Sequence, residues 1–310
     1  MEEKNSINIA IKKLFAGELI IFPTETVYGI GADATNHLAV KKIYKIKKRP
    51  LNNPIISHFK NLKKVSDHVE LNEYAIKLAE SFWPGPLTLI LKKKKLSTIS
   101  PHVSNYNKLI GCRVPNHPVI NKIFESFNRP IAAPSANIST KLSVTNYKHL
   151  DKKFKKNVFT ISGGNCNLGL ESTVINLVTN IPTILRYGSI STEEIKKIIP
   201  DIQSNVLAED KPISPGKSIK HYSPNIPIRI NVNKVLKGEV LLNFGLNNLT
   251  SNVLELNLSI AGDLKEASKN FFSYLHKLDS NKHKGIAVAP IPNTGLGKTI
   301  NDRLIRASSK

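Results

Sequence analysis

The first 200 residues alternate between two patterns of apolar positions. Apolar side chains three or four positions apart are typical of amphipathic helices, and short aliphatic runs bounded by Gly, Pro or Asn are typical of strands. Helical spacing occurs at about 7–15, 38–47, 73–83 and 118–127, and strand-like runs occur at 19–21, 54–57, 87–91, 110–114 and 131–133. This alternation predicts an α/β fold.

The next stretch is rich in β-branched residues and leaves little room for helices. Strand-like runs at 158–161, 173–178 and 183–186 are separated only by turns that contain Gly, Asn or Pro. Strands joined by such short turns pair antiparallel, so we expect a twisted, mixed sheet rather than a wholly parallel one. A predicted helix at 192–199 ends this region.

Residues 200–227 show no periodic pattern and include Pro212, Pro215 and Pro224, which is typical of a connector. After it, strand-like runs at 228–232, 238–244, 253–256 and 285–289 alternate with helical patterns at 260–278 and 298–307. We therefore predict a first domain over 1–200, a linker over 201–227, and a small α/β domain with a largely parallel sheet over 228–310.

Length, composition and charge agree with a globular protein of two domains. A chain of 310 residues with 40% apolar content can bury two cores. Its formal charge of +22 favours phosphate-bearing partners such as nucleotides, RNA or an anionic surface. An equally open interpretation is a compositional bias, because most of the excess is scattered Lys accompanied by many Asn.

The two cysteines and the apolar runs indicate a cytoplasmic protein. Cys112 and Cys166 belong to no CxxC pair or metal-type cluster, which favours a reducing compartment. No apolar run approaches the roughly 20 residues that span a bilayer, so we expect no membrane partner.

The most informative segment is FPTETVYGIGADA, residues 22–34, directly after an apolar run. The run breaks at Pro23 and continues into hydroxyl side chains and closely spaced glycines. Such a segment presents hydroxyls and bare backbone at a strand end, where a ligand can approach. We interpret the whole stretch as a binding loop.

Three basic side chains stand where regular structure is expected to end. Lys47 and Arg49 precede the helix-breaking Pro50, and Arg113 ends a strand before Pro115. The planar fork of Arg matches pairs of phosphate oxygens, and Lys adds a mobile point charge, so the set suits a triphosphate. Alternatively, Lys47 and Arg49 form a solvated helix end favoured by the helix dipole.

Small polar residues follow several strands in the same way. The turn Ser135-Ala136-Asn137, the pair Ser172-Thr173 and His58 could each bind an anion or a small ligand. Each also has an ordinary structural interpretation, as a helix cap, surface hydroxyls or a satisfied histidine.

Other catalytic motifs are incomplete or missing from the sequence. None of the nine histidines falls in an HExxH arrangement, so we predict no protein metal site, and Pro292 stands where a phosphate-binding P-loop needs its first glycine. Neither a G-x-S-x-G elbow nor a cysteine in a nucleophile context occurs.

Together these segments resemble the threonylcarbamoyl-adenylate synthases, the YrdC-like family, in their longer form with an added C-terminal domain. The resemblance covers essentially the whole chain and rests on many motifs in one order. These are PTETVYGIGADA, K-x-RP with NP and a His, GPLT, RVPNHP, PSANIS, STV, LR-x-G, SPGKSIKHYSP at 214–224 and LGKTINDRLIRAS near the end.

The resemblance implies a nucleotidyltransferase that condenses L-threonine, bicarbonate or carbon dioxide, and ATP into threonylcarbamoyl-adenylate, releasing pyrophosphate. The product would feed a downstream threonylcarbamoyl-transfer complex that modifies tRNA beside the anticodon, which leaves direct tRNA contact as an expectation. The implied fold is a twisted mixed sheet with a basic concave cavity, followed by a Rossmann-like domain. The chemistry requires Mg²⁺ carried largely by the ATP phosphates and no protein nucleophile.

The resemblance also assigns site residues. It implies catalytic roles for Lys47, Arg49 and Arg113, and a linker that closes over the nucleotide through Tyr222. L-Threonine would contact Thr24, His58, Ser135 and Ser172; ATP would contact Lys47, Arg49, Asn137, Ser143, Arg186 and Tyr222; Thr26, Thr88 and Thr173 are expected only to line the cavity.

The chain departs from the family pattern at several positions. Lys48 and Thr140 stand where the family usually has glycine, and Val144 replaces a proline beside Ser143. In the linker, Lys217-Ser218-Ile219-Lys220 replaces the usual M-K-Y-R. Two other functions stay open from the sequence: an RNA-binding module without catalysis, motivated by the charge, and a carbamoyl transferase, whose usual accessory domains do not occur in this sequence.

Overall fold

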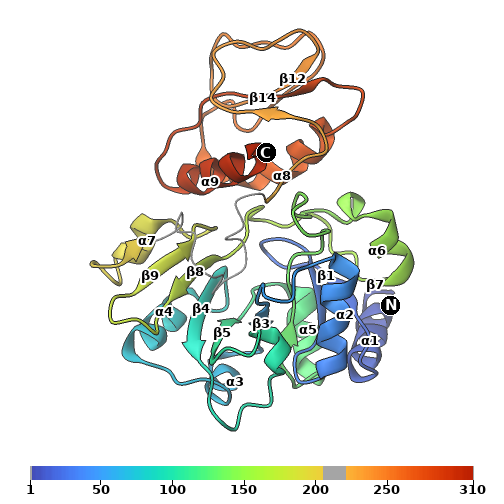
Figure 1. Ribbon diagram of the computed structural model, residues 1–310, viewed down its shortest axis with the longest axis vertical. Coiled ribbons are helices and arrows are strands. Elements are labelled where there is room, and N and C mark those ends of the chain that lie inside the picture. Colours follow the sequence, from blue (N-terminus) through green and yellow to red (C-terminus); the bar gives the residue numbers. More distant parts are fainter. Residues whose placement is uncertain (1, 205–220, 310) are drawn as a thin grey trace.

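The computed structural model describes residues 2–204 and 221–309, arranged as a larger N-terminal part and a smaller C-terminal part (Figure 1). In the N-terminal part, a ten-stranded sheet runs in the order β10-β9-β8-β4-β5-β3-β6-β2-β1-β7. Its elements are α1 (Glu2–Phe15), β1 (Ile20–Phe22), β2 (Gly29–Asp33), α2 (His37–Lys47), β3 (Ile56–His58), α3 (Leu62–Ser66), α4 (Glu73–Phe82), β4 (Leu87–Lys92), β5 (Leu109–Arg113), α5 (Pro118–Ser126), β6 (Ile131–Ala132), α6 (Lys152–Asn157), β7 (Phe159–Thr160), β8 (Thr173–Asn176), β9 (Thr183–Arg186), α7 (Thr192–Lys196) and β10 (Gln203–Ser204), with short 3₁₀ turns at Pro101–Val103 and Tyr147–His149.

The sheet is mixed, which confirms the prediction. Strand β4 pairs antiparallel with β5 but parallel with β8, and β3 pairs parallel with β5. Successive residues of a strand face opposite sides of a sheet. Accordingly Ile20 and Phe22 of β1 join the hydrophobic cluster beneath α1 and α5, whereas Ile21 joins the other, larger cluster. Both faces of the sheet are therefore covered, and the strand ends are free to carry the site.

Local signals explain why the helix that carries Lys47 begins and ends where it does. The side chain of Asn36 accepts a hydrogen bond from the backbone of Ala39, which caps the first turn of α2. The helix ends at Lys48, which has a left-handed backbone with φ of 51°, a conformation that glycine adopts most easily. This turn directs Arg49 away from the helix axis, so the prediction of a helix end before Pro50 is confirmed.

The structure corrects three sequence-based expectations. Gly29–Asp33 is the fully buried strand β2, so the binding loop is shorter than the stretch 22–34. The short helices α3 and α6 were not predicted, because five or six residues give too little periodicity. The helix expected from 260 begins only at Leu264, because Asp263 caps it and Gly262 before it has a φ of 74°.

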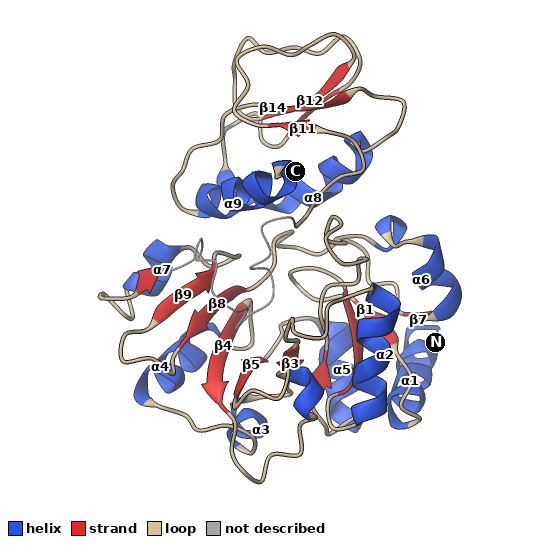
Figure 2. Ribbon diagram, in the orientation of Figure 1, coloured by secondary structure: helices blue, strands red, loops and turns tan. Residues whose placement is uncertain are grey.

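The C-terminal part is a small α/β unit, as predicted. Its strands pair wholly parallel in the order β11-β14-β12-β13, and both helices lie on the side of this sheet that faces the N-terminal part (Figure 2). Its elements are β11 (Ile228–Arg229), β12 (Glu239–Asn243), β13 (Glu255–Asn257), α8 (Leu264–Leu278), β14 (Gly285–Val288) and α9 (Leu296–Ser308).

The two parts share one hydrophobic cluster. Phe271 and Phe272 of α8 pack in the core of the C-terminal part, and Leu142 and Leu170 of the N-terminal part belong to that same cluster. Tyr222, at the described end of the predicted linker, completes it. The C-terminal core is thus closed partly by side chains of the first part.

Much of the predicted linker lies outside the described residues, including 214–220 of its motif. Before that gap, β10 adds to the edge of the large sheet beside β9, a strand that the sequence did not predict. After it, the backbone of Ser223 donates to the Thr140 carbonyl at 2.8 Å. In the described ranges, no helix is both long and apolar enough to cross a bilayer.

Candidate active site

A cavity of about 50 Å³ lies where loops at the strand ends of the large sheet meet residues of the linker. Its wall combines hydroxyl, imidazole and guanidinium groups from segments distant in the sequence. Among the sequence-predicted residues, those that line it are Thr24, Thr26, Arg49, His58, Arg113, Ser135, Ser172, Arg186 and Tyr222.

The loop between β1 and β2 forms one wall and is held by Arg113. The Thr24 hydroxyl donates to the Val27 carbonyl at 2.7 Å and lies 2.8 Å from the Thr26 hydroxyl. Arg113 Nη2 donates to Thr26 Oγ1 at 3.0 Å and pairs with Glu25 Oε1 at 2.7 Å. Since all these groups are buried, the loop presents a fixed polar surface to the cavity.

Another part of the wall is formed by Ser172, directly before β8, and by Arg186, the last residue of β9. Arg186 Nη2 donates to the Ser172 carbonyl at 2.8 Å and to its hydroxyl at 3.1 Å. The Thr88 hydroxyl lies 2.7 Å from the Ser172 hydroxyl, although Thr88 itself is not part of the wall. Thr173 likewise lies behind it and donates to the Ile190 carbonyl. These contacts fix both the serine and the guanidinium.

Lys47 lies beneath the turn of Ser135 and Asn137 rather than at the cavity surface. Its Nζ donates to the Ser135 carbonyl at 2.5 Å and also to the Asn137 carbonyl. The Asn137 amide in turn donates to the carbonyls of Ile138 and Lys141, both at 2.8 Å. Burial, and next the charge of Arg49, lower the pKa of Lys47 well below its ordinary value. The lysine thus shapes the turn with a charge that has no acidic counterpart.

Arg49 is bound by neutral groups only. Its guanidinium donates to the Asn53 carbonyl at 3.0 Å and to the Pro54 carbonyl at 2.7 Å. Burial is the main cause that lowers its pKa to about 10, and the nearby charge of Arg186 acts in the same direction. Across the described residues, neither Arg49 nor Lys47 forms an ion pair with a carboxylate. An anion entering the cavity would supply the missing negative charge.

His58 is a buried, neutral imidazole. Burial, followed by the charge of Arg113, lowers its pKa to about 3. Its Nδ1 has no hydrogen-bond partner among the described residues, which is unusual for a buried polar atom. The His58 ring lines the cavity, so a bound ligand would lie beside an imidazole with an unsatisfied nitrogen.

Ser143 is fully buried and does not reach the cavity wall. Its hydroxyl donates to Glu171 Oε1 at 2.5 Å, and Glu171 itself lines the cavity. Burial raises the pKa of Glu171, but the charges of Arg303 and Arg186 and the Ser143 hydrogen bond together lower it below its ordinary value. The carboxylate is therefore ionised at neutral pH.

Two linker residues cover the cavity. His221 and Tyr222 both line it, with ring centroids 3.9 Å apart, and the Tyr222 side chain is only 1% exposed. Ligand pockets usually enclose roughly 300–1,000 Å³. The cavity is much smaller than that in this conformation, with His221 and Tyr222 as part of its wall.

Comparison with known proteins matches this arrangement to a family. A family model described as "Telomere recombination", which groups the Sua5, YciO and YrdC proteins, matches residues 12–188. The chain belongs to the Sua5/YciO/YrdC family. A second model, described as "Threonylcarbamoyl-AMP synthase, C-terminal domain", matches residues 190–309, so this family member carries both regions of the long form.

Relatives of similar length match nearly the whole chain. The chain is 34% identical to the threonylcarbamoyl-AMP synthase of Pyrococcus abyssi, covering 99% of this chain and 95% of that protein. It is 35% identical to the Bacillus subtilis enzyme of the same name, covering 94% and 89%. The crystal structure of the P. abyssi Sua5 protein complexed with L-threonine superposes with a TM-score of 0.89 at 33% identity, over 97% of this chain and 94% of that one.

Sequence reasoning missed several residues at the site of this Sua5/YciO/YrdC member. Glu171 and His221 line the cavity, and Glu25 pairs with Arg113 at its edge. Glu171 stood next to the predicted Ser172, and His221, next to the predicted Tyr222, is a histidine that the sequence leaves open between ligand binding and a structural role. Arg303 contacts Glu171 from a helix more than a hundred residues away along the chain, so no local pattern could reveal it.

Proposed function

We propose that this protein is an L-threonylcarbamoyladenylate synthase, which condenses L-threonine, carbon dioxide or bicarbonate, and ATP with release of pyrophosphate. The observation that carries this proposal is one cavity in which Arg49, Arg113 and Arg186 face small hydroxyl groups and a neutral imidazole. Such a wall suits two ligands at once, a polyphosphate and a small zwitterion. Relatives that match nearly the whole chain carry the name of this activity.

The reaction requires binding and charge neutralisation rather than a protein nucleophile. The amine of L-threonine forms a nitrogen–carbon bond to carbon dioxide and loses a proton, giving a carbamate. A carbamate oxygen then attacks the α-phosphorus of ATP, and the bond to pyrophosphate breaks as the new phosphorus–oxygen bond forms. Fixed cations in a closed cavity bring the two anions together and stabilise the charge that develops.

L-Threonine would bind on the side formed by Thr24, His58, Ser135 and Ser172. The neutral His58, whose Nδ1 lacks a partner, is suited to a hydrogen bond with the threonine hydroxyl or carboxyl group. Arg113, which already orients the Thr26 hydroxyl, lies where it can attract the carboxylate or the carbamate. This side needs little rearrangement, because its groups are already fixed.

ATP would bind on the side of Arg49 and Arg186, with Tyr222 above it. Lys47, Asn137 and Ser143 stand behind this wall. In our proposal they reach the nucleotide when it enters, Lys47 exchanging a carbonyl for a phosphate oxygen. A phosphate would also raise the pKa of Lys47 again, because it supplies the negative charge that burial leaves missing.

Mg²⁺ would enter with the phosphates of ATP. In the described part of the chain, no cluster of three or more His, Cys, Asp or Glu side chains could hold a metal ion. The carboxylates beside the cavity, Glu25 and Glu171, already pair with arginines. These residues fit an ion held mainly by phosphate oxygens and water, where it would neutralise charge on the leaving pyrophosphate.

The linker would act as a lid. His221 and Tyr222 line a cavity too small for a nucleotide, so in our proposal ATP displaces them as it enters. We further propose that the product passes in the cytoplasm to a threonylcarbamoyl-transfer complex for tRNA modification, with the basic charge of +22 favouring contact with tRNA.

A pyrophosphate-release assay tests the function. Pyrophosphate should appear only when ATP, L-threonine and bicarbonate are all present, and D-threonine should not replace the L enantiomer. Mass spectrometry should detect threonylcarbamoyl-adenylate in the same mixture. Pyrophosphate release that is indifferent to threonine would contradict the proposal. Salt-sensitive RNA binding without ATP binding would instead support an RNA-binding module.

A further inference from the structure

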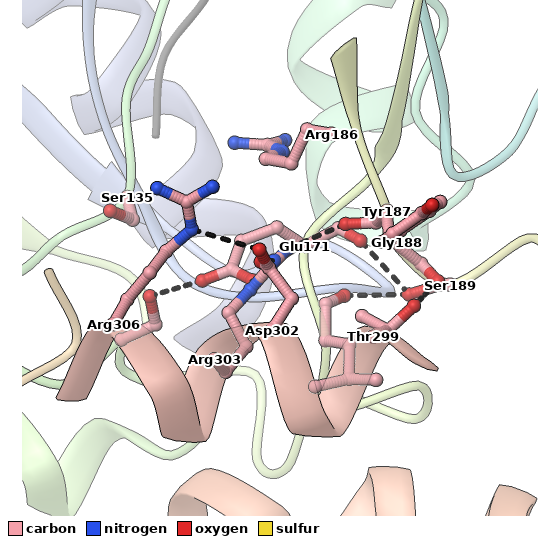
Figure 3. Close-up of polar contacts among 12 residues, drawn as sticks. Ser135, Glu171, Arg186, Tyr187, Gly188, Ser189, Thr299, Asp302, Arg303 and Arg306 are labelled. Atoms are coloured by element: carbon pink, nitrogen blue, oxygen red, sulfur yellow. Dashed lines mark hydrogen bonds and ion pairs between the residues drawn. The ribbon is translucent and has the colours of Figure 1, made fainter. Parts of the chain in front are cut away.

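Helix α9 of the C-terminal part places an arginine against the wall of the cavity. Arg303 is fully buried, at 0% exposure, and is the largest side chain in the described residues to be so. Figure 3 shows Thr299 and Arg303 projecting from this helix toward Glu171 and the segment Tyr187 to Ser189, whereas Arg306 extends from the same helix toward Ser135. The motif near the end of the chain thus packs directly on the catalytic part.

Arg303 is held in one orientation by hydrogen-bond acceptors around its guanidinium. Its Nε donates to Glu171 Oε2 at 3.0 Å and its Nη2 to the Tyr187 carbonyl at 2.7 Å. Its Nη1 donates to the Asp302 carboxylate, which also accepts from Arg306 Nε at 2.9 Å. Arg303 is therefore fixed both to its own helix and to the other part of the molecule.

Glu171 connects Arg303 to the cavity wall. Its Oε2 accepts from Arg303, its Oε1 accepts from the Ser143 hydroxyl at 2.5 Å, and the residue itself lines the cavity just before Ser172. The surrounding backbone is tightly packed, because a Cβ at Gly188 would lie 2.4 Å from the Ser172 carbonyl carbon. A carboxylate clamped in this way cannot turn without disturbing Ser143.

The same guanidinium touches the lid. The Arg303 carbon Cζ lies 4.8 Å from the centroid of the Tyr222 ring, within the range of cation–π attraction. Arg303 therefore contacts two groups that border the proposed nucleotide position, one below it and one above.

The buried contacts of Arg303 are not needed merely to hold the two parts of the molecule together. Lys298, on the same helix, pairs with Glu193 at 2.6 Å as a partly exposed ion pair between the parts, and the shared hydrophobic cluster packs them. A buried ion pair adds little stability over apolar residues of similar size. Its value in this position lies in fixing the direction of the Glu171 carboxylate.

We propose that Arg303 is a positioning residue for the nucleotide half of the site, acting through Glu171 on Ser143 and through its contact with Tyr222. This inference rests on the proposed function, and it assigns the C-terminal part a role in ordering the ATP site. Ser172 is held separately by Arg186 and Thr88. Loss of Arg303 should therefore weaken ATP binding and leave L-threonine binding nearly intact.

The test compares Arg303→Met with Lys298→Met in the full-length chain. Losing the charged hydrogen bond that orients Glu171 should raise both the KM and the Kd for ATP about tenfold or more, and should change the Kd for L-threonine by less than about threefold. The Kd values come from calorimetry on each ligand alone. Arg303→Lys, which keeps the charge but not the fork, should recover part of the ATP affinity. Lys298→Met should bind both ligands as the wild type does.

A second variant guards against simple unfolding. Removing one partner of a buried ion pair leaves the other charge uncompensated, so Arg303→Met is paired with the double variant Arg303→Met/Glu171→Gln. The double variant should fold, by circular dichroism and melting temperature, and should still bind ATP weakly. A folded double variant with wild-type ATP affinity would overturn the proposal, as would equal losses for both ligands or an equal effect of Lys298→Met.

These outcomes can be distinguished from a failure of the proposed function. If the wild-type protein released no threonine-dependent pyrophosphate, the proposed function would fail. The calorimetric comparison of ATP and L-threonine affinities would still decide whether Arg303 orders one half of the cavity.

Discussion

The two sides of the cavity are built in different ways. The side formed by Thr24, His58 and Ser172 uses short side chains near strand ends, and most of them are already hydrogen-bonded to each other or to backbone. The other side has Arg49 in the cavity wall and Lys47 behind it, two long basic side chains held only by neutral oxygens. The first side is preformed for a small ligand. On the second side, the basic side chains have no negative partner until an anionic ligand binds.

The largest effect is expected on the cationic side. Arg49→Ala removes a fork that can bind phosphate oxygens in pairs, and we expect kcat/KM for ATP to fall about a hundredfold or more. Pyrophosphate release measures it, with Lys45→Ala, at an exposed lysine in the last turn of α2, as the control. Similar losses in the two variants would show that general positive charge, not the position of Arg49, matters.

The neutral imidazole of the preformed side predicts a loss of stability in acid. Folded His58 has its pKa lowered from 6.5 to about 3, so between these values the unfolded state binds the additional proton. The stabilisation from neutral His58 is therefore complete above pH 6.5 and is lost as the pH falls toward 3. Between pH 6.5 and 5 this loss should amount to about 2 kcal/mol.

Urea unfolding of the wild type and of His58→Asn at several pH values checks this expectation. His149 and His276 also have lowered pKa values, mainly through burial, so the wild type should lose stability in acid more steeply than one group requires. The free energy of unfolding of the variant should depend less steeply on pH than that of the wild type, by the uptake of one proton. Parallel curves for the two proteins would mean that His58 does not stay neutral.

A smaller effect is expected when one hydroxyl of the preformed side is removed. Ser172→Ala should raise the KM for L-threonine about tenfold, since one hydrogen bond to a charged ligand is lost, with little change in the KM for ATP. Steady-state kinetics with each substrate varied separately measures this, and Ser81→Ala, an exposed serine of α4, is the matched control. A larger effect on ATP than on threonine would reverse the assignment of the two sides.

The smallest effect concerns the turn beneath the cationic side. Thr140 is a β-branched residue with a φ of 73°, a conformation that costs such residues free energy. Thr140→Gly should stabilise the fold by about 1 kcal/mol. Lys48→Gly, at an unbranched residue with a φ of 51°, should stabilise it by less. Thermal denaturation measures both, and a destabilised Thr140→Gly protein would show that the turn needs the threonine side chain.

Sequence patterns predicted the preformed side better than the cationic side. Thr24 follows the apolar run 19–21, His58 ends β3 and Ser172 directly precedes β8, so the boundary of a strand could be recognised locally at each of them. The roles of Lys47, Asn137 and Ser143 depend on hydrogen bonds across distant segments, such as that from Ser143 to Glu171. The buried strand β2 was missed because its glycines resemble a loop, although Gly31 lies so close to Phe22 that a Cβ would clash.

The shared hydrophobic cluster restricts how this molecule can open. Leu142 and Leu170 are buried among the apolar side chains of the C-terminal part, so pulling the two parts apart would expose both of their surfaces to water. Withdrawing Tyr222, in contrast, would remove a single side chain from this cluster. In the mechanism that we propose, a nucleotide is admitted by a local change at the linker while the shared cluster keeps the two parts together.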